Sequence, residues 1–365
     1  MLKLRWSLFL LVGALVLYCG ARGFGGEGGV PRLVSKELLT HGKMESVWEV
    51  KVPIKGKESL KQLVVLNNRI YAISDKNYVV SLNRHTGSVI FSREIAPAGF
   101  PMLGLGRYED ELFSIIGNAI IEINPDSGEE IRSERLAVRA TCPAVRNGSN
   151  FYVAGVDRRI HCLRSEDKVQ LFEAAAENDS IITSIVAEDS FVIFSTEGGN
   201  LIRISPDEPR LNWEFLASGG IVGPIIKDGE SLFIASEDTN VYKVSIIRGK
   251  LDWKYQANAV LDEAPRVTEN VVYQYAQQRG LTAIDRESGQ GIWELVEGAD
   301  LLVEWAGKAY VITKEPKLIV MDNNAGKQLY SVNLESISKY VSNVVDSKIY
   351  VGDDSGRIAC IKPVE

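Results

Sequence analysis

Histidines and cysteines are the residues whose types could most directly support catalysis or metal binding. The chain has three histidines, His41, His85 and His161, and four cysteines. A catalytic triad or a zinc site needs several such groups that converge, and none of the histidines has a partner at ligand spacing in the sequence. We interpret His41 as lying before the first strand, His85 in a hairpin turn and His161 as packed in a strand. The sequence predicts no catalytic residue.

Acidic pairs and glycine pairs are equally uninformative about cofactors. Asp353-Asp354 and Glu237-Asp238 fall in predicted tight turns, where solvated carboxylates are common without calcium. The glycine pair that begins at Gly198 follows a predicted strand and precedes no helix, so it is not a phosphate-binding loop. We therefore expect no metal and no cofactor.

The cysteines do not predict a disulfide. Cys162 and Cys360 occupy the same small-residue position in two non-adjacent repeats, which places them beyond the roughly 7 Å that a disulfide can span. Cys142 has no evident partner. Cys162 and Cys360 are expected to be packed thiols, and we expect no disulfide.

The first residues resemble an export signal. Lys3 and Arg5 precede an apolar run of about 13 residues, which suits a signal peptide and is too short to span a bilayer. Residues 1–21 are the expected signal peptide, 22–43 a flexible linker and 44–365 the folded domain. Two processing routes are open: lipid attachment at Cys19, or cleavage after Ala21.

Composition limits the partners. Hydrophobic residues make up 45% and charged residues 24% of the chain, as in a globular protein. The formal net charge is −7, and no long lysine or arginine run is present. Nucleic acid is therefore not an expected partner.

A repeat of about 40 residues organises the rest of the chain. Each unit reads as four short strands separated by turn residues, and consecutive units begin their second strand 37 to 42 residues apart. These second strands are marked by Tyr71, Phe113, Tyr152, Val192, Phe233, Tyr273, Tyr310 and Tyr350. The pattern predicts an all-β fold, a single eight-bladed β-propeller with four-stranded blades.

One sequence motif recurs at the third and fourth strands and is clearest from Ala283 to Trp293. Gly289 supplies a positive φ in the hairpin. Trp293 offers a flat surface that can wedge between adjacent blades. Trp213 and Trp253 occupy the same position in the fourth and fifth units.

The two ends of the chain complement each other. The eighth unit stops near Pro363, before a fourth strand, whereas residues 46–52 form a fourth strand with no unit in front of it. We therefore expect Trp48 and its strand to complete the last blade.

The sequence motif from Ala283 to Trp293 resembles the repeat of pyrroloquinoline-quinone propellers, and the resemblance covers residues 46–362. By size and blade number the chain is most similar to scaffold lipoproteins of the outer-membrane β-barrel assembly machinery. The resemblance implies a monomer within a complex that binds the barrel-forming subunit through two loops. Leu216 and Asp262 match part of those loops, whereas Ser218, Gly219 and Val260 depart from the family's Leu-x-Leu-Arg and Asp-x-Asp patterns.

Three functions from different classes are open for this sequence. The first is a non-catalytic periplasmic scaffold, in contact with the outer membrane only through a lipid anchor. The second is a quinone-dependent dehydrogenase, but such enzymes resemble one another in an adjacent cysteine pair and long loops that this chain lacks. The third is a propeller that binds a peptide or glycan at its centre.

Overall fold

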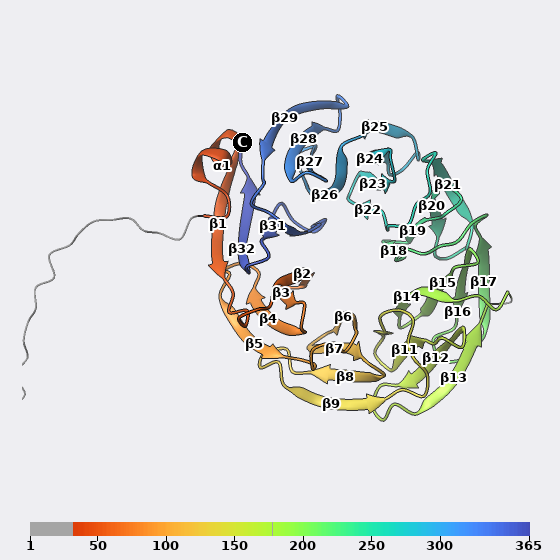
Figure 1. Cartoon of the computed structure of the whole chain (residues 1–365). Coiled ribbons are helices and arrows are strands. Elements are labelled where there is room, and N and C mark those ends of the chain that lie inside the picture. Colours follow the sequence, from red (N-terminus) through yellow and green to blue (C-terminus); the bar gives the residue numbers. More distant parts are fainter. Residues whose placement is uncertain (1–31, 177) are drawn as a thin grey trace, which may run out of the picture. The chain divides into compact units, whose positions relative to one another are not determined.

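The computed structural model describes residues 32–176 and 178–365, which form a ring of eight antiparallel four-stranded sheets (Figure 1). The first four blades, in chain order, consist of β2 (Leu60–Leu66), β3 (Arg69–Ser74), β4 (Tyr78–Asn83), β5 (Val89–Glu94); β6 (Met102–Tyr108), β7 (Glu111–Ile116), β8 (Ala119–Ile123), β9 (Glu130–Arg135); β10 (Val145–Arg146), β11 (Asn150–Ala154), β12 (Arg159–Arg164), β13 (Gln170–Ala175); and β14 (Ile182–Glu188), β15 (Phe191–Thr196), β16 (Asn200–Ile204), β17 (Leu211–Leu216).

Blades 5 to 8 continue the same order. Their strands are β18 (Ile226–Asp228), β19 (Ser231–Ala235), β20 (Asn240–Ser245), β21 (Leu251–Gln256); β22 (Arg266–Val267), β23 (Val271–Ala276), β24 (Gly280–Asp285), β25 (Gly291–Leu295); β26 (Gly298–Trp305), β27 (Lys308–Thr313), β28 (Lys317–Asp322), β29 (Lys327–Asn333); and β30 (Lys339–Val341), β31 (Ile349–Gly352), β32 (Arg357–Pro363), β1 (Met44–Lys51). The predicted eight-bladed, four-stranded fold is confirmed.

The core lies between blades and not at the ring axis. The second and third strands of each blade are buried on both faces because a neighbouring blade covers each side, so they are nearly continuous apolar runs. The fourth strands alternate between exposed and half-buried residues. Tyr152 and Cys162 of blade 3, for example, pack with Val192 and Phe194 of blade 4.

The first strand closes the ring as predicted. β1 pairs antiparallel with β32, and Trp48 lies opposite Cys360. The last blade therefore combines the two ends of the chain (Figure 1).

Fourth-strand aromatic residues join several blades to the blade that follows. The ring of Trp253 lies against Gly289 of the following blade, and its Nε1 donates to the carbonyl oxygen of Arg286 at 2.9 Å. Trp293 donates instead to the side-chain oxygen of Asn323 at 2.9 Å. Equivalent ring-to-glycine contacts join Trp48 to Gly87, Phe91 to Gly128 and Trp213 to Gly249. The predicted packing of an aromatic side chain between adjacent blades is thus a specific contact between the ring and a glycine of the next blade.

Gly289 should tolerate no side chain. Its φ is +70°, and a Cβ there would lie 2.7 Å from the Trp253 ring. Because both backbone strain and a steric clash oppose it, Gly289→Ala should lower the free energy of unfolding by about 2 kcal/mol or more. Urea denaturation measures this, with Gly56→Ala as control because a Cβ at Gly56 meets nothing within 4 Å. Equal midpoints for the two variants would refute the packing role.

The structure corrects one boundary. Residues 32–43 were expected to belong to a flexible linker, but α1 (Lys36–His41) forms there, capped by the Ser35 hydroxyl. Leu33, Val34 and Leu39 are buried against the seventh and eighth blades because they are the apolar face of this short segment. Residues 22–31 lie outside the described part.

Two smaller points concern other elements. In the sixth blade the first strand covers only Arg266–Val267, and the preceding residues form the connection between blades. Within the described part, no helix is long and apolar enough to cross a membrane.

Candidate functional site

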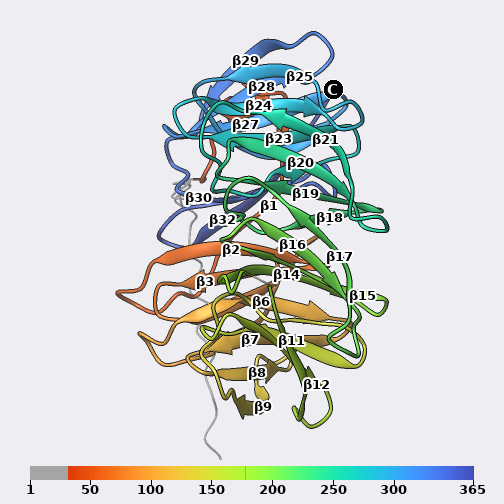
Figure 2. The same ribbon diagram turned by 90° about the vertical axis from the view of Figure 1, so that its right-hand side faces the viewer.

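The ring has two faces, which the topology separates. Successive strands run in opposite directions, so connections between blades, such as residues 217–225 and 257–265, share one face with the turns between second and third strands, such as 237–239. We call this the connection face. The remaining turns, such as 246–250, lie on the opposite side, the hairpin face. Figure 2 views the ring after a 90° turn.

Leu216 and Asp262 lie on neighbouring connections of the connection face. Leu216 ends β17 and is 65% exposed. Asp262 is exposed and accepts a hydrogen bond from the Gln277 side chain at 2.9 Å. A Cβ at Gly223 would lie 3.4 Å from the carbonyl oxygen of Asp262, so the two connections touch. Their partner-binding role remains a prediction.

Packing explains one departure from the family's loop pattern. Gly219 stands where an arginine is expected, and a Cβ there would lie 2.5 Å from the backbone nitrogen of Asp238. The backbone N–H of Ser218 also donates to the Asp238 carboxylate at 2.9 Å. Burial alone would raise the pKa of Asp238, but hydrogen bonds from Tyr242, Asn240 and Ser218 hold it below its ordinary value. An anionic carboxylate therefore lies beside Ser218 and Gly219.

A second group of charges lies on the innermost strands. Arg266 of β22 donates to both carboxylate oxygens of Asp300 on β26, at 2.9 and 2.8 Å. Partial burial, together with nearby Asp300, raises the pKa of Tyr340 on β30 to about 12. These residues are far apart in the sequence and were not identified from it.

The innermost strands do not fit a calcium-held quinone. Asp300 is buried there, but its carboxylate is already held by Arg266. Within residues 32–176 and 178–365, the one group of three His, Cys, Asp or Glu side chains close enough to share a metal ion is Asp157, His161 and Glu173, in the third blade around β12 and β13.

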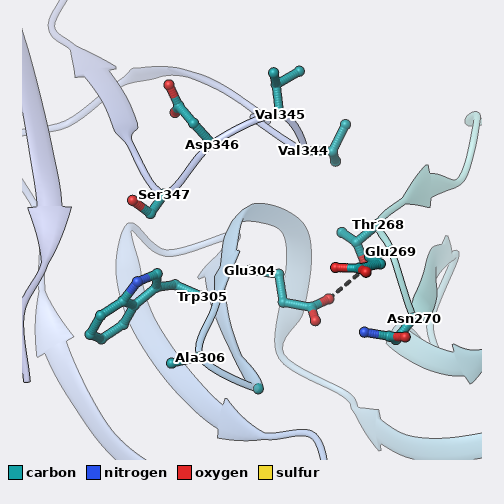
Figure 3. A pocket seen from close by; sticks show the side chains of 11 residues that line it. Thr268, Glu269, Asn270, Glu304, Trp305, Ala306, Val344, Val345, Asp346 and Ser347 are labelled. Carbon is teal, nitrogen blue, oxygen red and sulfur yellow. Dashed lines mark hydrogen bonds between the residues drawn. The ribbon is translucent and has the colours of Figure 1, made fainter.

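A pocket of about 400 Å³ opens on the hairpin face between blades 6, 7 and 8 (Figure 3). Its lining is largely polar, and the carboxylate of Glu304 forms part of the wall. Glu304 accepts hydrogen bonds from the hydroxyls of Thr268 and Tyr273, each at 2.6 Å. This carboxylate therefore joins blades 6 and 7.

The cysteines and histidines are placed as follows. Cys142, Cys162 and Cys360 are buried and free, and burial raises the pKa of each thiol to about 12, so they are poor nucleophiles. Cys19 lies outside the described residues.

His161, expected to be simply packed, instead lies beside two carboxylates, those of Asp157 and Glu173. The sequence signal for this was the four-residue spacing from Asp157 across a tight turn.

Comparisons with known proteins agree on the family. The family described as outer membrane protein assembly factor BamB, a PQQ-repeat family, matches residues 117–227 and 217–306. BamB of Yersinia pestis is 24% identical over 204 residues, which is 51% of this chain and 51% of that protein. The match thus spans about half the length of this curated relative.

Solved structures support the fold. The crystal structure of BamB from Moraxella catarrhalis gives a TM-score of 0.68 at 14% identity, covering 87% of this chain and 97% of that one. The computationally designed Ika8 protein gives 0.64 at 12% identity, covering 84% and 96%. Because the family match covers more than half of the sequence, the chain belongs to the PQQ-repeat propeller family of outer membrane protein assembly factor BamB.

Proposed function

We propose that this protein is a non-catalytic scaffold of the cell envelope that assists the assembly of β-barrel outer-membrane proteins. Its partner is the barrel-forming, BamA-type subunit of the assembly machinery. The observation that carries the proposal is the placement of Leu216 and Asp262 on touching connections of one face. Membership of the BamB family supplies the biological context.

The chemistry of the connection face suits a protein partner. Leu216, Val260 and Val296 are 65%, 47% and 71% exposed, and Asp262 and Glu263 add carboxylates beside them. Exposed apolar side chains with charged neighbours are typical of protein-binding surfaces. The partner surface should therefore present apolar side chains with basic groups around them.

A catalytic role has less support. The buried thiols have raised pKa values, and the innermost strands do not fit a calcium-held quinone. The proposed location is the periplasm, with residues 1–21 acting as signal peptide. Lipid attachment at Cys19 would add an anchor to the outer membrane, whereas cleavage after Ala21 would leave a free protein.

Site-specific photo-crosslinking in cells tests the partner. A photo-reactive residue at position 216 or 262 should capture the barrel-forming subunit. Position 247 is the matched control, because Ile247 is 61% exposed but lies on the hairpin face. Equal capture from all three positions, or capture of the subunit from 247 alone, would contradict the assignment of the face.

Leu216→Asp should weaken binding of the purified subunit at least five-fold, because it replaces an apolar contact with a carboxylate that must lose its hydration on binding, at a cost of more than about 1 kcal/mol. Ile247→Asp makes the same chemical change at similar exposure and should leave the dissociation constant unchanged. Surface plasmon resonance measures both. Similar losses for the two variants would argue against the site.

A further inference from the structure

We propose that His161 and Glu173 bind a divalent transition-metal ion such as Zn²⁺, with Asp157 orienting the histidine. The turn 155–158 and the strands β12 and β13 bring the three side chains together, and their ligand atoms lie within 4.8 Å of one another. The site lies on blade 3 and is independent of the proposed scaffold function.

Asp157 fixes which nitrogen of His161 carries the proton. The Nε2 atom lies 2.9 Å and 3.1 Å from the two carboxylate oxygens of Asp157. An ionised carboxylate can only accept hydrogen bonds, so Nε2 carries a proton, and in the neutral imidazole Nδ1 then carries a free lone pair. A carboxylate that holds one histidine nitrogen while the other binds metal is a recurring arrangement.

The free nitrogen is buried and has no hydrogen-bond partner. The His161 side chain is 6% exposed, and its Nδ1 lies 3.9 Å from Oε2 of Glu173. A buried acceptor without a donor costs free energy, which a cation would recover. Ligands of a tetrahedral zinc ion lie roughly 3.4 Å apart, so a small movement of the partly exposed Glu173 side chain would let one ion contact both atoms.

The surrounding residues prepare this arrangement. A Cβ at Gly155 would lie 2.2 Å from Oδ1 of Asp157 and 3.1 Å from Nε2 of His161, so glycine leaves room for the pair. Arg159 forms an ion pair with Oε1 of Glu173, which leaves Oε2 as the oxygen facing His161. The Nε2 of Gln170 donates a hydrogen bond to Oε2 of Glu173 at 3.5 Å. Water would complete the coordination of the ion.

Metal titration of the protein, without a polyhistidine tag, tests the site. Isothermal titration with Zn²⁺ should give one ion per chain, and Co²⁺ should show a visible absorption band. His161→Gln keeps a donor for Asp157 but removes Nδ1, and Glu173→Gln removes the second ligand. Each should weaken binding at least ten-fold, as should Asp157→Asn through the loss of orientation.

His85→Gln is the matched control, because His85 is an exposed histidine in a hairpin turn and should not affect binding. Nitrogen-15 NMR of the imidazoles gives a readout that a purely structural role would not move. We expect His161 to be protonated at Nε2 without metal and its Nδ1 resonance to shift with Zn²⁺. No saturable binding, undiminished binding in both ligand variants, or an apo protein protonated at Nδ1 would overturn the proposal.

Discussion

A protein that begins at residue 53 should fail to form the monomeric fold that a protein beginning at residue 32 forms. β1 pairs with β32 from Met44 to Lys51, and Trp48 packs on Gly87 of the first blade. About four ladder hydrogen bonds at about 1 kcal/mol each, together with about 3 kcal/mol for the tryptophan, approach the 5–15 kcal/mol that stabilises a typical domain. Size-exclusion chromatography with light scattering and circular dichroism measures the loss.

A second truncation separates the strand from the segment before it. A protein that begins at residue 44 loses α1, with its buried Leu39, but keeps β1 and should remain a folded monomer of reduced stability. A peptide of residues 44–52, added in excess to the shorter protein, should restore the fold, because the exposed edge of β32 is a template for strand pairing. Identical melting of the proteins that begin at 32 and at 53 would exclude the closure.

The propeller was predictable because its signals are local and repeated. Each second strand, such as the one at Tyr273, is a short apolar run, and the sequence motif from Ala283 to Trp293 identifies the third and fourth strands of the blade. The pairing of the N-terminal strand around Trp48 with the last blade was predictable because the last repeat lacks a fourth strand and the N-terminal strand has no repeat before it. The helix at residues 36–41 was missed because six residues give too little periodicity to register.

The candidate sites were less predictable because they depend on contacts between blades. Family resemblance identified Leu216 and Asp262, but only the structure shows that Gly219 leaves room for Asp238. Arg266 and Asp300 are 34 residues apart and meet only when blades 6 and 7 pack together. No single-sequence pattern carries such a pairing.

Arg84 should be the most important single side chain at the boundary between blades 8 and 1. It is 6% exposed, and it donates to the hydroxyl of Tyr350 at 2.8 Å and to the Asn343 side chain at 3.2 Å. It also pairs with Asp346 at 3.0 Å and donates to the carbonyl oxygen of Asn67 at 3.2 Å. The guanidinium therefore joins the two blades beside the indole of Trp48, which donates to the Arg84 carbonyl oxygen.

Arg84→Ala should lower the free energy of unfolding by about 2–3 kcal/mol, because the buried Tyr350 hydroxyl loses its hydrogen-bond donor and the contacts between the blades are lost, whereas Asp346 keeps Asn343 and Lys348. Arg84→Lys should recover only part of this, since an ammonium cannot reproduce the planar set of donors. Arg93→Ala is the control: the pair between Arg93 and Glu129 is about half exposed on both sides, so its loss should cost less than about 1 kcal/mol. Guanidinium denaturation measures all three variants. If Arg84→Ala unfolds at the same midpoint as Arg93→Ala, the stability of the ring does not depend on the Arg84 contacts. The pairing of β1 with β32 must then stabilise the boundary between blades 8 and 1 without them.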